Sequence, residues 1–168
     1  MTSHRTSDAK ANKAKVGKAS NSMSALNNVR EQIGRAMLDR ALSSNRHEFG
    51  SFFLSRFFGF EITYDVDRCT VSFEATEPMF NPQGSLHGGI LATAMDIAMG
   101  HLLQHVSGAG TTLEMKIQYI GSVRGGVVRC EASFLRVGRS ISFLQCIARS
   151  HDEVVVAHAT STWKRVRR

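Results

Sequence analysis

Cysteine and long apolar runs are scarce in this sequence of 168 residues. Its three cysteines are odd in number, lie far apart and show no C-x-x-C spacing, which excludes a disulfide framework and gives no support to a zinc site. No stretch approaches about eighteen uninterrupted apolar residues, and the N-terminus lacks the apolar core of a secretory signal. Because this cysteine usage fits a reducing compartment, we expect a cytoplasmic protein with no transmembrane segment.

Two common catalytic motifs are also missing. Ser85 and Ser140 do not lie in a G-x-S-x-G sequence, which argues against a serine hydrolase. His101 and His105 share a helix face at four-residue spacing, but the glutamate of an H-E-x-x-H metal site is absent and no third ligand is evident. We therefore expect surface or interface histidines at these positions, and neither a metal nor a cofactor.

Positive charge is concentrated at the two ends of the chain. The formal net charge is +7, of which residues 1–30 carry +5 and residues 164–168 carry +4, so the body between them is slightly acidic. A basic arm at each end could touch nucleic acid or anionic lipid. Solvated, disordered ends are the favoured interpretation, because the folded part is not basic, and no nucleic-acid partner is expected.

The chain is long enough for one compact domain, preceded by two accessory segments. Residues 1–24 are polar and rich in Lys, Ala, Ser and Asn, which predicts a disordered basic tail. Residues 25–48 are predicted to form an amphipathic helix, and residues 49–168 the main domain. The helix prediction depends on apolar residues that recur every three to five positions: Leu26, Val29, Ile33, Met37 and Leu42.

Phenylalanine is concentrated in one short stretch, with six of the ten in the chain between positions 49 and 60. Such rings serve either the core and a subunit contact or the lining of a pocket for an apolar ligand. We assign most of them to the core and one or two to a pocket. Phe57 and Phe58 are the candidates for that pocket.

The remaining pattern predicts an α+β fold. Two alternating apolar segments predict a β-hairpin, a largely apolar run predicts one buried helix, and four further alternating segments predict a meander of strands. One helix against five or six antiparallel strands indicates a sheet that wraps around the helix. The predicted hairpin strands span 60–64 and 69–75, the helix 87–106, and the later strands 111–120, 125–137, 140–150 and 154–163.

The strand predicted over 111–120 alternates cleanly between apolar and polar residues. Leu113 and Tyr119 fall on the apolar face, whereas Thr112 and Glu114 fall on the polar one.

A single carboxylate, Asp96, interrupts the apolar run of the predicted helix. An ionised Asp inside a buried helix costs several kcal/mol unless a partner compensates it. The residue is therefore a candidate catalytic group. An Asp at the solvent edge of the helix, or one paired with a buried His or Arg, is the alternative.

Gly88 and Gly89 stand at the start of the same helix. Backbone N–H groups there have no partner within the helix and lie at the positive end of its dipole, so they suit an oxyanion. Asp96 is eight residues further on, roughly 12 Å along the helix axis. Because one small reacting group cannot touch both, joint action would require two antiparallel copies of the helix in a dimer.

Three motifs resemble those of one known family. They are NPQGSLHGG from Asn81 to Gly89 followed by Asp96, then GTTLEM from residue 110, and VGRS from residue 137. In this order they resemble the hotdog-fold acyl-CoA thioesterases, most closely the phenylacetate-pathway, PaaI-like branch that includes thioesterase superfamily member 2. The resemblance covers residues 57–163, whereas residues 1–45 have no counterpart in it.

The resemblance implies a hotdog fold and the hydrolysis of aryl-acyl or medium-chain acyl-CoA, with coenzyme A present only as part of the substrate. It implies active sites at the interface of a homodimer, commonly paired into a homotetramer. Asp96 would activate a water or attack the thioester directly, and the Gly88 N–H would polarise the thioester carbonyl. Asn81 would orient the thioester or the water, and Thr112 would orient the water. His87 would brace the loop and contact the carbonyl.

Coenzyme A phosphates are expected near Arg136 and Arg139, because guanidinium forks suit phosphate. A merely solubilising role for each arginine stays open. The other implied substrate contacts are Gly89, Gly138, Ser140, Phe57 and Phe58. A non-catalytic hotdog module that binds acyl-CoA as a sensor or regulatory subunit is the alternative function. Asp96 favours the enzyme, because a pure binder has no use for a carboxylate facing a thioester.

Overall fold

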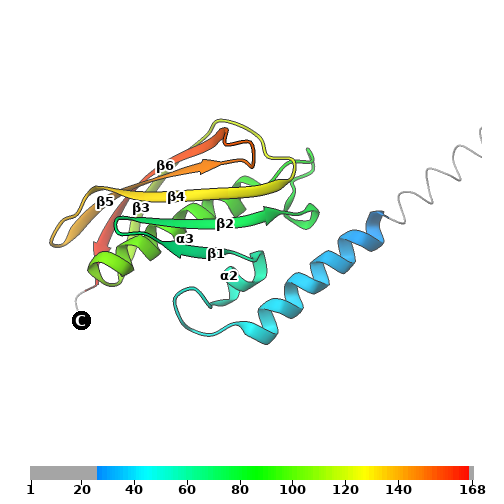
Figure 1. Ribbon diagram of the computed structural model, residues 1–168, viewed down its shortest axis with the longest axis horizontal. Coiled ribbons are helices and arrows are strands. Elements are labelled where there is room, and N and C mark those ends of the chain that lie inside the picture. The colour runs from blue at the N-terminus through cyan, green and yellow to red at the C-terminus, as the bar shows by residue number, and fades with distance from the viewer. Residues whose placement is uncertain (1–25, 167–168) are drawn as a thin grey trace, which may run out of the picture.

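The computed structural model describes residues 26–166, in which an antiparallel sheet curves over one long helix and a second long helix lies beside it (Figure 1). The tail predicted over 1–24 lies outside the described residues. Within them, no helix is long and apolar enough to cross a membrane. The elements in chain order are a helix over 26–44, α2 (Phe53–Phe58), β1 (Glu61–Tyr64), β2 (Arg68–Ala75), the 3₁₀ turn η1 (Glu77–Met79), α3 (Gly88–Ser107), β3 (Gly110–Tyr119), β4 (Gly126–Arg136), β5 (Ile141–Arg149) and β6 (Val155–Arg165).

The six strands form one sheet in the order β1-β2-β4-β5-β6-β3, and every pair is antiparallel. The predicted α+β class, the β1–β2 hairpin and the helix covered by the sheet are confirmed. The predicted meander is wrong in one respect, because β3 pairs with β6 at the far edge and β4 pairs with β2. Alternation determines which face of a strand is buried, but it does not determine which strand lies beside it.

A β-bulge in β3 reverses part of the predicted alternation. The register against β6 shifts between Thr112 and Glu114, so that Leu113 is the extra residue. A one-residue shift turns side chains to the opposite face of a strand. Thr112 therefore faces α3, whereas Leu113, which was predicted on the apolar face, is 55% exposed.

Helix α3 is twenty residues long and lies against one face of the sheet (Figure 1). Its other side, with Thr93, Asp96, Ile97 and Gly100, is only half-buried. The prediction of a helix buried all round therefore holds for one side of α3, and the half-buried stripe remains open to another surface. The buried side consists of Leu91, Ala94, Met95, Ala98, Met99, His101, Leu102 and Leu103.

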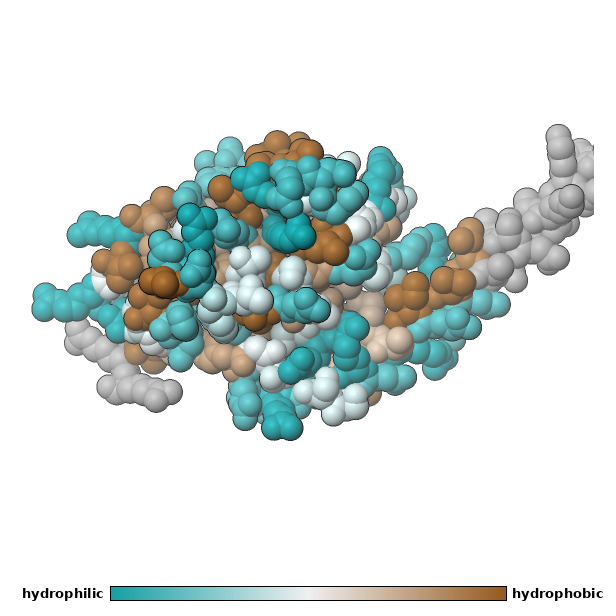
Figure 2. All heavy atoms as spheres, in the orientation of Figure 1, coloured by the Kyte–Doolittle hydropathy of each residue, from teal (hydrophilic) through white to brown (hydrophobic). Residues whose placement is uncertain are grey.

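The helix over 26–44 packs on the domain mainly through its C-terminal half. Met37 and Ala41 are buried in that half. Leu26 and Val29, in the first turn, are 58% and 52% exposed, and apolar atoms are visible along this helix in Figure 2. Part of the predicted apolar stripe thus docks on the domain and part of it faces solvent.

Arg40 joins this helix to α2. Its guanidinium donates to the carbonyl oxygens of Arg56 at 2.7 Å and Phe57 at 2.9 Å. Carbonyls at the end of a helix have no intrahelical partner, and a cation there also interacts favourably with the helix dipole. Since both flanking helices are held in this way, the loop over 45–52 is anchored at each end.

Gly100 allows α3 to approach Trp163 closely. An added Cβ at Gly100 would lie 2.8 Å from the Trp163 ring, and that indole is held by a hydrogen bond of 2.7 Å from its Nε1 to Ser161 Oγ. We predict that Gly100→Ala lowers the free energy of unfolding by about 1–3 kcal/mol through overpacking. Urea denaturation followed by circular dichroism measures this change.

Gly34→Ala is the matched control, because nothing lies within 4 Å of an added Cβ on Gly34 in the helix over 26–44. It should raise stability by roughly 0.5–1 kcal/mol, as expected for a glycine replaced in a helix interior. Equal effects of the two substitutions would contradict the close packing of Trp163 on α3.

Candidate active site

A cavity of about 530 Å³ opens beside α3. Its walls come from α3, the beginning of β3, the end of β6 and the loop over 45–52. The lining combines aromatic rings with polar and charged side chains, so the cavity suits a ligand that has both apolar and polar parts. The lining residues that bear on its chemistry are Phe49, Phe52, Asp96, His101, Thr112 and Trp163.

Asp96 and Thr112 meet in this cavity. Thr112 Oγ1 donates a hydrogen bond of 2.9 Å to Asp96 Oδ1, and the bulge in β3 puts the hydroxyl within reach. Burial raises the pKa of Asp96 above its ordinary value of 3.8, and the Thr112 hydroxyl partly opposes that shift by stabilising the charged form. A carboxylate with a raised pKa is a stronger base when ionised, so the pair suits proton abstraction.

His101 is buried in the same cavity, which corrects the expectation of a surface or interface histidine. The residue is only 4% exposed, and its Nδ1 lies 2.6 Å from the Tyr64 hydroxyl oxygen. Burial lowers the pKa of His101 to about 4, so the imidazole is neutral at pH 7. His105 is exposed, and its ring stacks on the Tyr64 ring with the two centroids 4.8 Å apart.

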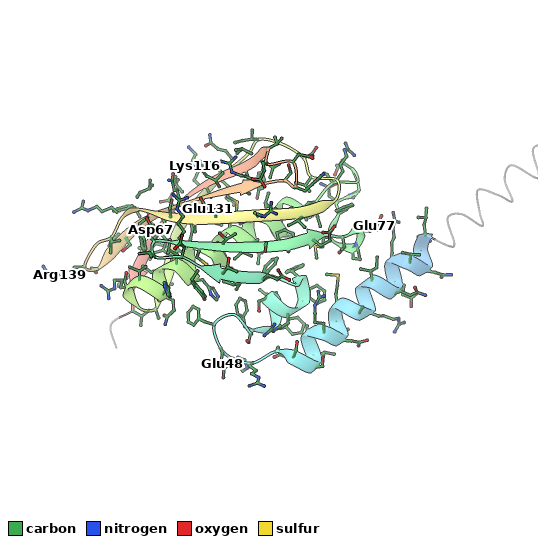
Figure 3. All side chains as sticks on the ribbon, in the orientation of Figure 1. Glu48, Asp67, Glu77, Lys116, Glu131 and Arg139 are labelled. Atoms are coloured by element: carbon green, nitrogen blue, oxygen red, sulfur yellow. The ribbon has the colours of Figure 1, made fainter. Side chains whose placement is uncertain are left out.

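The loop over 45–52 brings two phenylalanines to the cavity. Arg46 N–H donates to the Ser51 carbonyl at 2.6 Å, which closes the loop, and Figure 3 shows Glu48 on it between the N-terminal helix and α2. Phe49 and Phe52 line the cavity from this loop. The cluster of phenylalanines in the sequence predicted that one or two of them line a pocket, but their spacing did not identify Phe49 and Phe52 as those residues.

Phe57 and Phe58, the predicted pocket residues, are placed elsewhere in this chain. They are partly buried against the hydrophobic core, and the two rings meet edge to face at 5.1 Å. The loop that turns after the N-terminal helix, rather than α2, supplies the aromatic wall next to Asp96.

The start of α3 is arranged around His87, Gly88 and Gly89. His87 is the N-cap, and its Nδ1 accepts a hydrogen bond of 2.9 Å from the Gly89 N–H. That bond occupies the Gly89 donor, whereas the Gly88 N–H has no partner within residues 26–166. Tyr119 covers Gly88, and its hydroxyl donates to the Gly88 carbonyl at 2.9 Å. Gly88 is therefore the donor that remains for a ligand.

Asn81 braces the loop before α3. Its Oδ1 accepts from the Gln83 N–H at 3.0 Å, and its Nδ2 donates to Ser85 Oγ at 3.2 Å. Asn81 does not line the Asp96 cavity of the same chain. Its predicted contact with a thioester or water stays a prediction.

Arg136 and Arg139 are exposed at the turn between β4 and β5, and Figure 3 shows Arg139 at the tip of that hairpin. Gly138 allows the turn, because an added Cβ would overlap the Ile141 carbonyl oxygen. Ser140, Lys164 and Arg165 line a shallow hollow at the same end. These residues form a basic surface outside the Asp96 cavity.

Metal ligation is not supported in the part of the chain that the structure describes. No group of three or more His, Cys, Asp or Glu side chains there is placed to hold a metal ion. The polar groups in the cavity are suited to proton transfer and hydrogen bonding.

The chain is similar to several known proteins. A family model described as "Thioesterase superfamily" matches residues 83–157. The medium/long-chain acyl-CoA thioesterase YigI of Salmonella typhimurium is 28% identical over 98 residues, covering 48% of this chain and 63% of that protein. The conserved protein PA5202 of Pseudomonas aeruginosa is 30% identical, with a TM-score of 0.63 and coverage of 67% of this chain and 92% of that one. The BH2602 protein of Bacillus halodurans, solved with CoA, is 24% identical, with a TM-score of 0.72 and coverage of 82% and 93%.

Residues 83–157 of the chain match the thioesterase superfamily. The predicted family and the predicted hotdog fold, a long helix wrapped by an antiparallel sheet, are thereby confirmed. The chain spans 63% of the length of the curated relative that it matches.

The ionised Asp96 carboxylate should lower the free energy of unfolding at neutral pH. Since its pKa is raised on folding, the folded chain holds the Asp96 proton more tightly than the unfolded chain does. Stability is therefore lost as pH rises from 3.8 through the raised pKa. Asp96→Asn keeps the acceptor for Thr112 and removes the charge, so the variant should be more stable than the wild type at pH 7.

Urea denaturation at several pH values measures this gain, which should be complete above the raised pKa and should vanish as pH falls toward 3.8. Asp39→Asn, on the exposed side of the N-terminal helix, is the control and should show no such trend. A pH-independent loss of stability in Asp96→Asn would contradict the burial of the Asp96 charge.

Proposed function

We propose that the protein hydrolyses acyl-CoA thioesters to the free acid and CoA in the cavity beside α3. The observation that carries the proposal is Asp96, a half-buried carboxylate with a raised pKa in a cavity partly lined by aromatic rings, with the Thr112 hydroxyl 2.9 Å away. The match of residues 83–157 to the thioesterase superfamily and the activity in the name of YigI support it. The CoA bound to BH2602 supports CoA as part of the ligand.

In the proposed reaction a water attacks the thioester carbonyl carbon, and Asp96 accepts a proton from that water. The carbon–sulfur bond then breaks, CoA leaves as a thiolate that is later protonated, and the acid is released. Direct attack by the Asp96 carboxylate, followed by hydrolysis of the resulting anhydride, uses the same residue. Thr112 orients Asp96 in either route, and negative charge on the carbonyl oxygen needs a backbone donor such as the Gly88 N–H.

The rings of Phe49, Phe52 and Trp163 in the cavity lining support an aryl or medium-chain acyl group as the part of the substrate that enters it. Arg136 and Arg139 are the groups suited to the CoA phosphates, because they are exposed and free to form bidentate contacts.

Asp96→Asn should lower kcat/KM for thiol release by about 10²- to 10⁴-fold, since it removes the group that takes the proton. A panel of aryl and straight-chain acyl-CoAs, with a colorimetric assay for free CoA, measures the loss. Asp39→Asn should retain wild-type rates. A wild type that binds these thioesters and releases no thiol from any of them would favour an acyl-CoA-binding module instead.

The complete site is proposed to form between two copies of the chain. Gly88 and Asp96 are eight residues apart on one straight helix, so their own backbones stand roughly 12 Å apart. β3 lies at the edge of the sheet, and the half-buried stripe of α3 faces away from it. Pairing of two such edges would place antiparallel α3 helices side by side, with Gly88 of one copy near Asp96 of the other, and would cover both surfaces. A pair of these dimers is the expected larger assembly.

Complementation between two inactive variants tests the shared site. Gly88→Pro removes the N–H at a helix position that tolerates proline, and Gly88→Ala is the steric control that keeps the N–H. Gly88→Pro and Asp96→Asn should each be inactive alone. After mixing and subunit exchange, about one quarter of the wild-type activity should return, because half of the dimers then hold one intact site. Mixtures that stay inactive despite proven exchange would place both residues in one chain's site.

A further inference from the structure

His101 is the buried polar group of the cavity that the proposed reaction does not use. It lines the same cavity as Asp96 and lies five residues further along α3, a rise of roughly 7.5 Å. Among its neighbours, the Trp163 indole N–H is already bonded to Ser161. His47 and Glu48 also line the cavity, but both are exposed. His101 therefore provides a buried hydrogen-bonding group in the cavity, separate from the reacting carboxylate.

The imidazole is held in one orientation. Phe49 meets it edge to face with ring centroids 5.0 Å apart, and Phe52 lies 6.1 Å away by the same measure. On the other side, Nδ1 pairs with the Tyr64 hydroxyl at 2.6 Å. A phenol donates readily to a neutral imidazole, which leaves the proton on Nε2. Nε2 has no partner within residues 26–166, so it is the ring nitrogen available to a ligand.

We propose that His101, positioned by Tyr64, determines acyl specificity by donating a hydrogen bond from Nε2 to an oxygen substituent on the acyl group. The inference rests on the proposed thioesterase function and specifies its substrate class: acyl groups that carry a hydroxyl or keto oxygen near their far end. The separation of His101 from Asp96 along α3 places that oxygen several bonds away from the thioester carbonyl.

The physical reason is the cost of leaving a buried donor unpaired. An unsubstituted acyl chain that fills the cavity removes water from His101 and offers no acceptor in return, whereas an oxygenated chain replaces the lost hydrogen bond. A site built to pair with a polar substituent rejects the analogue that lacks it more strongly than an apolar site rejects an extra hydroxyl. The neutral state of His101 at pH 7 suits an uncharged oxygen.

Two matched substrate pairs test the proposal on the full chain. They are ω-hydroxyhexanoyl-CoA with hexanoyl-CoA, and para-hydroxyphenylpropanoyl-CoA with phenylpropanoyl-CoA. The wild type should favour the oxygenated member of at least one pair by about 10-fold in kcat/KM. His101→Leu should reduce that ratio by about 10-fold, Tyr64→Phe should reduce it less, and His101→Gln, which restores a side-chain N–H, should recover part of it.

His105→Leu is the control, because His105 shares the helix and the Tyr64 contact but is exposed and does not line the cavity. It should leave the substrate ratio at the wild-type value. A ratio that is the same in the wild type and in His101→Leu for both pairs would overturn the proposal, because a merely structural role of His101 would change both substrates of a pair alike.

Binding of non-hydrolysable analogues separates this inference from the proposed function. In these analogues a methylene replaces the thioester carbonyl, and calorimetry gives the ratio of Kd values for each pair. The same loss of preference in His101→Leu is expected. If the wild type releases no thiol, the thioesterase proposal fails, and the Kd ratio still decides for or against recognition by His101.

Discussion

Burial of α3 against one face of a single sheet is the constraint on which the other features depend. The sheet covers one side of the helix with Met95, Met99, Leu102 and similar residues, and leaves the side with Asp96 half-buried. A carboxylate in that position is removed from much of the water without being sealed in the core. Its raised pKa and its place at a cavity wall both follow from this partial burial.

The edge of the sheet completes the environment of Asp96. Only because β3 leaves its regular register does the Thr112 hydroxyl reach the carboxylate, at 2.9 Å. Bulges are frequent next to active sites because they turn one side chain without disturbing the rest of the strand. β3 is also an edge strand of the sheet. The bulge that brings Thr112 to Asp96 therefore lies where a second copy of the chain is proposed to pair.

The segment before the sheet contributes part of the cavity wall. Arg40 ties the N-terminal helix to α2, and the loop between them carries Phe49 and Phe52 to the cavity that Asp96 also lines. The Phe49 ring also packs against His101 and helps to fix the orientation of its imidazole. Burial of His101 lowers its pKa and keeps it neutral. The matched family model covers residues 83–157 and does not include this segment.

The sequence by itself determined the α+β class, the β1–β2 hairpin, the long helix and Asp96 as its exceptional residue, because apolar periodicity and the cost of a buried charge are local properties. The motifs around His87 and Gly88 indicated the family. Only the tertiary structure decided that β3 pairs with β6, that a bulge turns Thr112 inward, and that Phe49 lines the cavity rather than Phe57. It also decided that His101 is buried. These features depend on contacts between segments far apart in the chain, and neither spacing nor composition encodes which distant surfaces meet.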